Sequence, residues 1–312
     1  MRKQIRTDLA MEAVNAGERT SIDGVKMNQW SAGGVEITEV RIDSEQGAKM
    51  LGKAPGHYVT LECPGLARHE LEERRRVSDL LGQQIERLLE GRINKAQPVL
   101  VIGLGNRKIT PDSLGSKVVD RTLVTRHLFN TMPEKMDERM RSVCALAPGV
   151  LGVSGLETFE VVKSLVDRLN PCCLICIDSL AARSTRRVGS AVQLTDTGIQ
   201  PGSGVGNHRS ALNQQSLGVP VLAVGMPMVV YAATIARDAL ELLSEGMQQD
   251  DQLDEALDEL AGQLSGNAVG DMIVTPREVD SLIDQAAWVL ARGINRALQP
   301  ALSDEEIQTM ME

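Results

Sequence analysis

In the first third of the chain, the pattern of hydrophobic and polar residues predicts two short strands and one long helix. Between Val35 and Val40 they alternate, which indicates a strand with one buried face. The segment from Tyr58 to Glu62 indicates a second strand. From Arg68 to Leu89, the leucines and an isoleucine recur at helical spacing and predict a charged amphipathic helix. Residues 1–30 are polar and mixed, without a stable period.

From residue 98 onwards the pattern changes to short, continuous apolar runs. Such runs are expected of strands buried on both faces of a sheet. The predicted strands are Pro98–Ile102, Ser142–Ala147, Cys172–Ile177, Ala191–Leu194 and Val219–Val224. Helices are predicted between them, at about Asp112–Phe129 and Glu157–Leu169. This alternation predicts an α/β fold with a doubly wound, mostly parallel sheet flanked by helices.

The C-terminal part differs from the rest in both pattern and charge. After Ser244 we expect helices at about 251–265, 276–298 and 303–311. The 312-residue chain has 42 acidic and 33 basic residues, a formal net charge of −9. Residues 245–312 contain 15 acidic and 3 basic residues, a net charge of −12, which leaves +3 for the remainder. The acidity is therefore a property of the helical C-terminal part.

Composition excludes some classes of function. A general phosphate-binding protein needs a basic surface, which the overall charge argues against. Six aromatic side chains are too few for a platform on which single-stranded bases stack. The five cysteines are odd in number and three lie in one apolar run, which argues against a disulfide framework. The N-terminus lacks the apolar region of a signal peptide, and we predict a cytoplasmic protein.

Two short motifs match binding signatures only in part. Gly47–Lys53 matches the first seven positions of a P-loop motif. Ala54 then stands where the motif needs a serine or threonine whose hydroxyl binds magnesium. Cys173 and Cys176 have redox-motif spacing, yet they lie inside an apolar run and are expected to be buried in a strand. We interpret both motifs as structural.

The triplet Asp196-Thr197-Gly198 is the signature of pepsin-like and retroviral aspartic proteases. Those folds are all-β and need two copies of the triplet, whereas this chain has one copy in an α/β pattern. The triplet is therefore predicted to be a strand end followed by a glycine-rich loop.

Two other carboxylates are placed better for catalysis. Asp112 lies in the first turn of the helix predicted after the first buried strand, and Asp178 directly follows the run Cys172–Ile177. In an open parallel sheet, ligands bind outside the carboxyl ends of the strands, so both aspartates fall on the reactive edge. Two close carboxylates can divide the roles of acid and base. Each one could instead be a simple helix-start or strand-end residue.

These aspartates lie in motifs through which the chain resembles a known family, the germination proteases of spore-forming bacteria. The resemblance covers nearly the whole chain, and so many matches in order are highly specific. It is carried by Arg6–Ala10 with Glu12, Tyr58–Glu62, Ile102–Asn106, Thr110–Asp112, Leu123–Phe129, Ala147–Gly149, Ile177–Ser184, Thr195–Ile199, Pro201–Asn207 and Val274–Asp280.

The resemblance implies an endopeptidase that starts the degradation of small acid-soluble spore proteins during germination, in the forespore and spore core. It implies a fold similar to hydrogenase-maturation endopeptidases and a homotetrameric zymogen that removes a short N-terminal segment. Family members cut after an acidic residue that is followed by a hydrophobic residue and alanine. Asp8-Leu9-Ala10 fits this rule, so we expect self-cleavage between Asp8 and Leu9. The chain then divides into a propeptide (1–8), an α/β catalytic domain (9–244) and a helical segment packed on it (245–312).

Carried over by motif, the catalytic pair of the family falls on Asp112 and Asp178. No cofactor, metal, nucleic acid or membrane partner is expected. Arg183, Arg186 and Arg187 follow Asp178 closely and could hold the acidic side chain of the substrate, unless they form a solvated basic surface.

The chain departs from the family pattern beside the proposed pair. Arg107 replaces an aromatic residue, and Ser113 and Ser116 replace the usual Ala and Pro. Two alternative functions stay open. One is a metallopeptidase that uses the same carboxylates with His127 or His208, and the other is an oligomer that binds spore proteins without cutting them.

Overall fold

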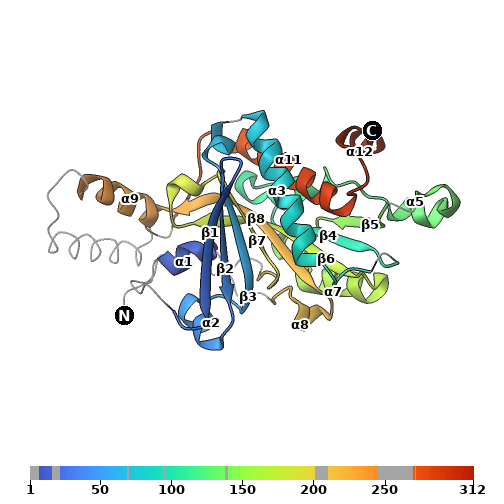
Figure 1. The fold of residues 1–312 in the computed structure, drawn as a ribbon, viewed down its shortest axis with the longest axis horizontal. Helices are drawn as coiled ribbons and strands as arrows, with labels where there is room; N and C mark the ends of the chain where they lie inside the picture. The colour runs from blue at the N-terminus through green and yellow to red at the C-terminus, as the bar shows by residue number, and fades with distance from the viewer. Residues whose placement is uncertain are drawn as a thin grey trace.

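A nine-stranded sheet runs through the centre of the molecule (Figure 1). The structure is a computed structural model that describes residues 7–15, 22–68, 70–94, 96–137, 140–200, 210–244, 270 and 272–312. The strand order is β1-β2-β3-β7-β8-β6-β4-β5, and β9 pairs with β8. The strands are β1 (Val25–Ala32), β2 (Val35–Ile42), β3 (Gly56–Glu62), β4 (Val99–Gly103), β5 (Val143–Leu146), β6 (Cys173–Ala182), β7 (Ala191–Thr195), β8 (Val221–Tyr231) and β9 (Ile273–Val274).

One half of the sheet is parallel and the other half is antiparallel. Strands β5, β4, β6 and β8 are parallel neighbours. Strand β7 joins β8 in antiparallel orientation, and β3, β2 and β1 continue the antiparallel half. The α/β class is confirmed, but the sheet is less parallel than the sequence pattern predicts. Short apolar runs such as β7 show burial, and burial alone does not reveal strand direction.

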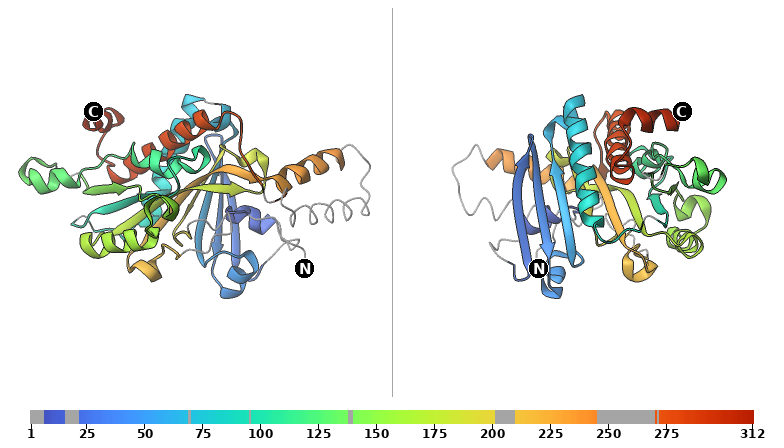
Figure 2. Two further views of the ribbon diagram at one scale, coloured as in Figure 1. Left: turned by 180° about the vertical axis from the view of Figure 1, so that it is seen from behind. Right: turned by 45° about the vertical axis from the view of Figure 1, so that its right-hand side comes forward.

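Helices α3 (Leu71–Leu89) and α11 (Val279–Leu298) pack side by side against one face of the sheet (Figure 2). They share a core with α4 (Leu114–Val119). The buried Asn295 of α11 accepts a hydrogen bond from Leu123 N at 2.9 Å. Gln299 accepts one from Arg141 N at 2.9 Å. Helix α11, although far along the chain, is thus bonded to the loops around the parallel half of the sheet.

Two further cores cover the other face. Helices α7 (Thr158–Leu169) and α8 (Gln214–Leu217) pack beside β4 and the first part of β6. Helices α1 (Ala10–Asn15) and α2 (Glu45–Leu51) pack on β2, β3 and the last part of β6. The remaining helices are η1 (Pro64–Arg68), η2 (Thr110–Asp112), α5 (Arg126–Thr131), η3 (Pro133–Lys135), α6 (Leu151–Ser154), η4 (Thr185–Arg187), α9 (Ala232–Ser244) and α12 (Asp304–Met311).

Several element boundaries differ from the sequence prediction. The helix expected at about Asp112–Phe129 is three pieces, η2, α4 and α5. Strand β6 continues past Asp178 to Ala182, and β8 continues beyond the predicted end at Val224 to Tyr231. Helix α1 and strand β1 lie in the N-terminal region that shows no period. The predicted helices 276–298 and 303–311 are confirmed as α11 and α12, whereas 251–265 lies outside the described residues.

Within the described ranges, no helix combines the length and the apolar character needed to cross a membrane. The five cysteines are free thiols.

Candidate active site

Asp178 lies where β6 passes the end of its neighbour β4. The last strand pair is Gly103 with Ile177, and the next backbone amide, Leu104 N, donates to Ile177 O at 2.8 Å. On the other side of β6, Gly225 of β8 is in register with Asp178. The Asp178 Oδ1 atom accepts a hydrogen bond of 2.9 Å from Ser179 N. Asp178 is half-buried and stands within β6, just beyond the carboxyl end of β4.

Asp112 is brought to the same end by the loop that follows β4. It is the last residue of η2, and its amide donates to Ile109 O at 2.9 Å. Asn106 N donates to Asp112 Oδ2 at 2.7 Å, so the loop is fastened to the carboxylate. Gly105 has a φ of +94°, and a Cβ there would lie 2.1 Å from Asp112 O and 2.9 Å from Asp112 Oδ1. Only glycine fits this close approach.

Helix α4 packs directly on the end of β4 and so positions η2. A Cβ at Gly103 would lie 2.1 Å from Gly115 O, and a Cβ at Gly115 would lie 2.3 Å from Leu104 O. These two glycines let helix and strand backbones touch. As a result η2 contacts both β6 and β8. The structure therefore places η2, which ends at Asp112, in contact with β6, whose residue Asp178 stands just beyond the end of β4.

The three residues near Asp112 that differ from the family pattern each form hydrogen bonds close by in the chain. The buried Ser113 donates from its hydroxyl to Thr110 O at 2.8 Å, and the buried Ser116 donates to Ser113 O at 2.8 Å. Arg107 forms two hydrogen bonds with Asp120, at 2.7 and 3.0 Å. The two hydroxyls thus satisfy carbonyls of the η2–α4 turn, and the guanidinium is held on the surface by its own carboxylate.

Cys176 is a buried thiol two residues before Asp178. Burial, followed by the charge of Asp178, raises the pKa of Cys176 to about 12. At neutral pH the thiol is therefore protonated and a poor nucleophile. Cys173 is likewise buried, so the pair with redox spacing lies inside the sheet.

The three candidate arginines have different environments. Arg187 donates to Glu12 Oε1 at 2.9 Å and to Glu62 Oε1 at 2.6 Å. The charge of these carboxylates and their hydrogen bonds raise the pKa of Arg187 despite burial, which opposes the charged form. The side chain of Arg186 is exposed, and Arg183 is half-buried and bonds through its backbone N to Glu12 Oε2 at 2.7 Å. Their role toward substrate stays a prediction.

The segment that contains the predicted cleavage bond is packed into the protein. Leu9 and Ala10 are fully buried. Asp8 N donates to Ala181 O at 3.0 Å, and Asp8 Oδ2 accepts from Ala181 N at 2.8 Å. The Asp8 carbonyl accepts from Lys53 Nζ at 3.0 Å and Gln193 Nε2 at 2.9 Å. The bond between Asp8 and Leu9 must therefore be released before it can be cut.

Sequence reasoning did not select the residues that hold this segment. Lys53 fell in a rejected P-loop match, and Gln193 lies in an ordinary apolar strand. Glu12 was indicated only as part of a motif shared with the family. It is buried, and Ser184 N donates a hydrogen bond of 3.1 Å to its Oε1 atom. The contacts join residues more than 40 positions apart, so no local pattern indicates them.

The Asp196 triplet has a structural role. Asp196 Oδ1 accepts from His57 N at 2.8 Å, and its Oδ2 pairs with Arg92 Nη2 at 3.3 Å. Asp196 thus fastens the end of β7 to the start of β3. Gly47–Lys53 runs through helix α2 and its C-terminal turn, as expected from the rejection of a P-loop.

The described part of the chain contains no group of three His, Cys, Asp or Glu residues arranged to hold a metal ion. His127 is exposed on α5, and His208 lies outside the described residues.

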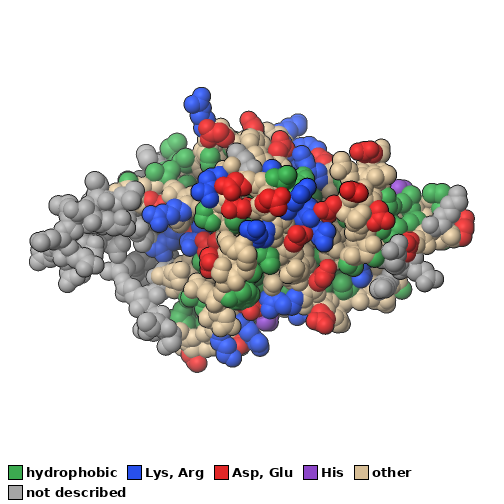
Figure 3. All heavy atoms as spheres, turned by 45° about the horizontal axis from the view of Figure 1, so that its top comes forward, with side chains coloured by type: hydrophobic (Ala, Val, Ile, Leu, Met, Phe, Trp, Pro, Cys, Tyr) green, Lys and Arg blue, Asp and Glu red, His purple; other side chains and the backbone are tan. Residues whose placement is uncertain are grey.

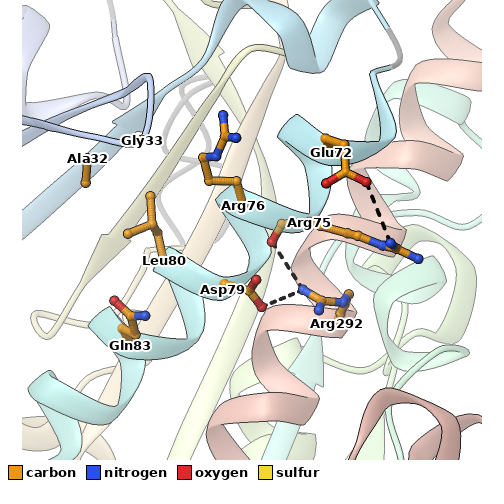
Figure 4. Close-up of a pocket in the computed structure, with 9 residues that line it drawn as sticks. All are labelled: Ala32, Gly33, Glu72, Arg75, Arg76, Asp79, Leu80, Gln83 and Arg292. Atoms are coloured by element: carbon orange, nitrogen blue, oxygen red, sulfur yellow. Dashed lines mark hydrogen bonds and ion pairs between the residues drawn. The ribbon is translucent and has the colours of Figure 1, made fainter.

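A hollow of about 450 Å³ lies on the α3 and α11 face, lined by Ala32 and Gly33 of the β1–β2 hairpin and by residues of both helices (Figure 4). Arg292 donates to Asp79 at 2.7 Å, and Arg75 faces Glu72 at 3.7 Å. Acidic and basic side chains are interspersed over this face (Figure 3). Neither proposed catalytic aspartate lines the hollow, so we assign no role in the reaction to it.

Residues 3–263 match the Germination protease family. Similar proteins named Germination protease come from Caldanaerobacter subterraneus subsp. tengcongensis (42% identical, 98% of each chain covered) and Clostridium tetani (40% identical, 98% of this chain and 99% of the relative covered). A third comes from Bacillus cereus (36% identical, 96% and 95% covered). A solved hydrogenase maturation protease from Thermococcus kodakarensis KOD1 covers 67% of this chain and 97% of its own, with 14% identity and a TM-score of 0.35.

The family match over most of the chain defines a protease. The chain belongs to the germination protease family and is an endopeptidase of spore germination.

Proposed function

We propose that the protein is a self-processing aspartic endopeptidase that starts the degradation of small acid-soluble spore proteins. One observation carries the proposal: Asp112 lies on η2, which contacts β6, and Asp178 stands on β6 just beyond the end of the parallel strand β4, in a member of a protease family. The carboxyl edge of the parallel strands is where ligands bind in open α/β sheets. The substrates are inferred from the family to which the chain belongs.

The two aspartates divide acid and base chemistry. One carboxylate removes a proton from water, whose oxygen attacks the carbonyl carbon of the peptide bond. The other, protonated, donates a hydrogen bond to the carbonyl oxygen and then gives its proton to the leaving nitrogen as the C–N bond breaks. Asn106 holds Oδ2 of Asp112, which fixes the orientation of that carboxylate. Either aspartate could be the base.

Self-cleavage between Asp8 and Leu9 completes the proposal. The sequence Asp8-Leu9-Ala10 has the acidic, hydrophobic and alanine residues expected around a cut. Residues 1–8 are then a propeptide, 9–244 the catalytic domain and 245–312 a helical segment packed on it. We further propose a homotetramer in the forespore and spore core, with Arg183, Arg186 or Arg187 near the acidic residue of the substrate.

The test is cleavage of a purified small acid-soluble spore protein by a chain that begins at Leu9. Asp112→Asn and Asp178→Asn should each abolish cleavage while circular dichroism and thermal unfolding stay as in the parent. Asp196→Asn is the matched control, since Asp196 is a carboxylate at another strand end with purely structural contacts. Full activity in either catalytic variant removes that residue from the mechanism. Loss of activity in a chelator would instead support a metallopeptidase, and binding without cleavage would support the non-catalytic alternative.

A further inference from the structure

Thr7 and Asp8, the last two residues of the proposed propeptide, lie in a polar site that we call the Thr7–Asp8 site. Asp8 N donates to Ala181 O at 3.0 Å, and Asp8 Oδ2 accepts from Ala181 N at 2.8 Å. Lys53 Nζ donates to the carbonyl oxygens of Asp8 and Thr7, at 3.0 and 3.1 Å. Gln193 Nε2 donates to Asp8 O at 2.9 Å. The site thus binds the backbone of both residues, and two donors converge on the carbonyl of the predicted scissile bond.

The hydroxyl of Thr7 adds a contact to a buried carboxylate. Thr7 Oγ1 donates to Glu12 Oε2, and it accepts from Leu9 N at 3.1 Å. Glu12 is buried and also accepts from Arg183 N at 2.7 Å. Thr7 is therefore held through its side chain as well as its backbone.

Cleavage between Asp8 and Leu9 would leave the Thr7–Asp8 site intact. All the partner residues come after residue 8 in the sequence, so they stay on the longer fragment. Leu9 and Ala10 are fully buried, and Ala10 N donates to Gln193 Oε1 at 2.7 Å. The cut end of the longer fragment is thus anchored by packing and by a hydrogen bond that does not involve residues 1–8.

Hydrolysis changes the charge of the two groups that the bond joins. The oxygen of water joins the carbonyl carbon of Asp8, the C–N bond to Leu9 breaks, and the products at neutral pH are an α-carboxylate on Asp8 and an α-ammonium on Leu9. The Asp8 oxygen that accepts from Lys53 and Gln193 becomes part of the carboxylate. Charge on the acceptor strengthens its hydrogen bonds and adds Coulombic attraction to the ammonium of Lys53. The cut segment therefore gains a stronger contact with Lys53 as it loses the covalent bond to Leu9.

The Thr7–Asp8 site is separate from the position of the proposed catalytic aspartate. Ala181 is three residues past Asp178, about 10 Å along an extended strand. There β6 pairs with β8, after β4 has ended opposite Ile177. A peptide in the site thus docks on the strand that carries Asp178, but beyond the aspartate.

We propose that the Thr7–Asp8 site is a docking site for the cut propeptide, which it holds through the new C-terminal carboxylate of Asp8. Cleavage then turns residues 1–8 from a covalent segment into a bound ligand, and their departure is a step separate from the cut. The inference rests on the proposed function, because it takes the bond between Asp8 and Leu9 to be hydrolysed.

Three synthetic peptides test the site on a chain that begins at Leu9, whose fold is checked by circular dichroism. The first is residues 1–8 with a free C-terminal carboxylate, the second ends in an amide, and the third carries an additional glycine after Asp8. Isothermal titration calorimetry should show that the free-acid peptide binds at least 10-fold more tightly than either of the others. The amide lacks the charge that Lys53 binds, and the added glycine falls where Leu9 is buried. Non-specific attraction to this acidic protein would instead favour the more basic amide peptide.

Lys53→Met tests the residue that binds the carboxylate. In the chain that begins at Leu9, this variant should bind the free-acid and amide peptides within about 2-fold of each other. Lys49→Met is the matched control, because Lys49 is an exposed lysine of α2, and it should keep the preference of the parent. A free-acid peptide with Thr7→Val gives a second readout on the unaltered protein should Lys53→Met fail to fold. It lacks the hydrogen bond to Glu12 and should bind at least 5-fold more weakly than the unaltered peptide.

The self-cleaved full-length protein tests retention directly. Native mass spectrometry, after size-exclusion chromatography at neutral pH, should find residues 9–312 with residues 1–8 still bound.

Equal binding of the three peptides, or the absence of residues 1–8 from the purified self-cleaved protein, overturns the proposal. The peptide assay does not depend on hydrolysis. If it fails while Asp112→Asn and Asp178→Asn abolish cleavage, the docking site is wrong and the proposed function stands. If the free-acid peptide binds as expected while both variants remain active, the docking site stands and the aspartate mechanism is wrong.

Discussion

The backbone N–H of Asn106 donates a hydrogen bond of 2.7 Å to Oδ2 of Asp112. This bond ties the start of the loop that follows β4 to the carboxylate of Asp112, the last residue of η2. The close approach of Gly105 to Asp112 belongs to the same arrangement, since a side chain at Gly105 would push the carboxylate away. The orientation of Asp112 therefore depends on backbone geometry in a short stretch of sequence.

Gly105→Ala should lower kcat at least 10-fold. The methyl group would overlap Asp112 O, and the positive φ adds about 1–2 kcal/mol of strain. Gly52→Ala is the matched control, because Gly52 also has a positive φ (+63°) but has nothing within 4 Å of the added carbon. Gly52→Ala should lose about 1–2 kcal/mol of stability through the strain of its positive φ and should keep the kcat of the parent. Steady-state kinetics and urea unfolding of both variants make the comparison, and equal kcat values would contradict the role given to Gly105.

Iodoacetamide at pH 8 should leave cleavage activity intact. The pKa of Cys176 is about 12, so its thiol is protonated at that pH, and the side chain is fully buried. Mass spectrometry of the folded, treated protein should find Cys176 unmodified. Loss of activity in step with alkylation of Cys176 would point to a thiol in the mechanism.

Arg187→Met should destabilise the protein by roughly 2–3 kcal/mol, because the variant leaves Glu12 and Glu62 without their shared cation. Arg186→Met changes an exposed side chain and should shift stability by less than about 0.5 kcal/mol. Thermal and urea unfolding measure both effects. If Arg186 contacts the acidic residue of the substrate, its variant raises KM at unchanged kcat. Equal losses of stability in the two variants would argue against the ion pairs.

Glu39→Gln should cost stability at pH 7 and progressively less as the pH falls. Burial alone would raise the pKa of Glu39, but hydrogen bonds and charge from Arg87 and His57 lower it below the ordinary value. A lowered folded-state pKa stabilises the fold above the unfolded-state pKa, and that contribution is lost as the pH drops through the folded-state pKa. We expect a difference of about 1 kcal/mol at pH 7, reduced by solvent screening. Urea unfolding at several pH values measures it.

Glu36→Gln, which changes an exposed residue of the same strand, is the control for the loss of one negative charge. A difference between wild type and Glu39→Gln that stays constant down to acid pH would show that the ion pair is not its cause.

The sequence by itself determined the α/β class of the fold and indicated which two aspartates to consider. Continuous apolar runs marked β4, β6 and β8, because strands buried on both faces must be apolar throughout. Asp112 was expected in the turn region after β4 and lies there, on η2, whereas Asp178 was expected to end its strand and lies within β6. The motifs around them were specific enough to indicate the family that the whole-chain comparison shows.

Only the tertiary structure decided the strand directions, the extension of β6 beyond Asp178 and the burial of the N-terminal segment. Ala181 is a plain alanine in the sequence, and it becomes a binding group because β4 ends four residues before it. Lys53 and Gln193 meet Asp8 across 45 and 185 positions of sequence. Such contacts depend on how the sheet curves and what packs on it, and neither is a property of a local stretch of chain.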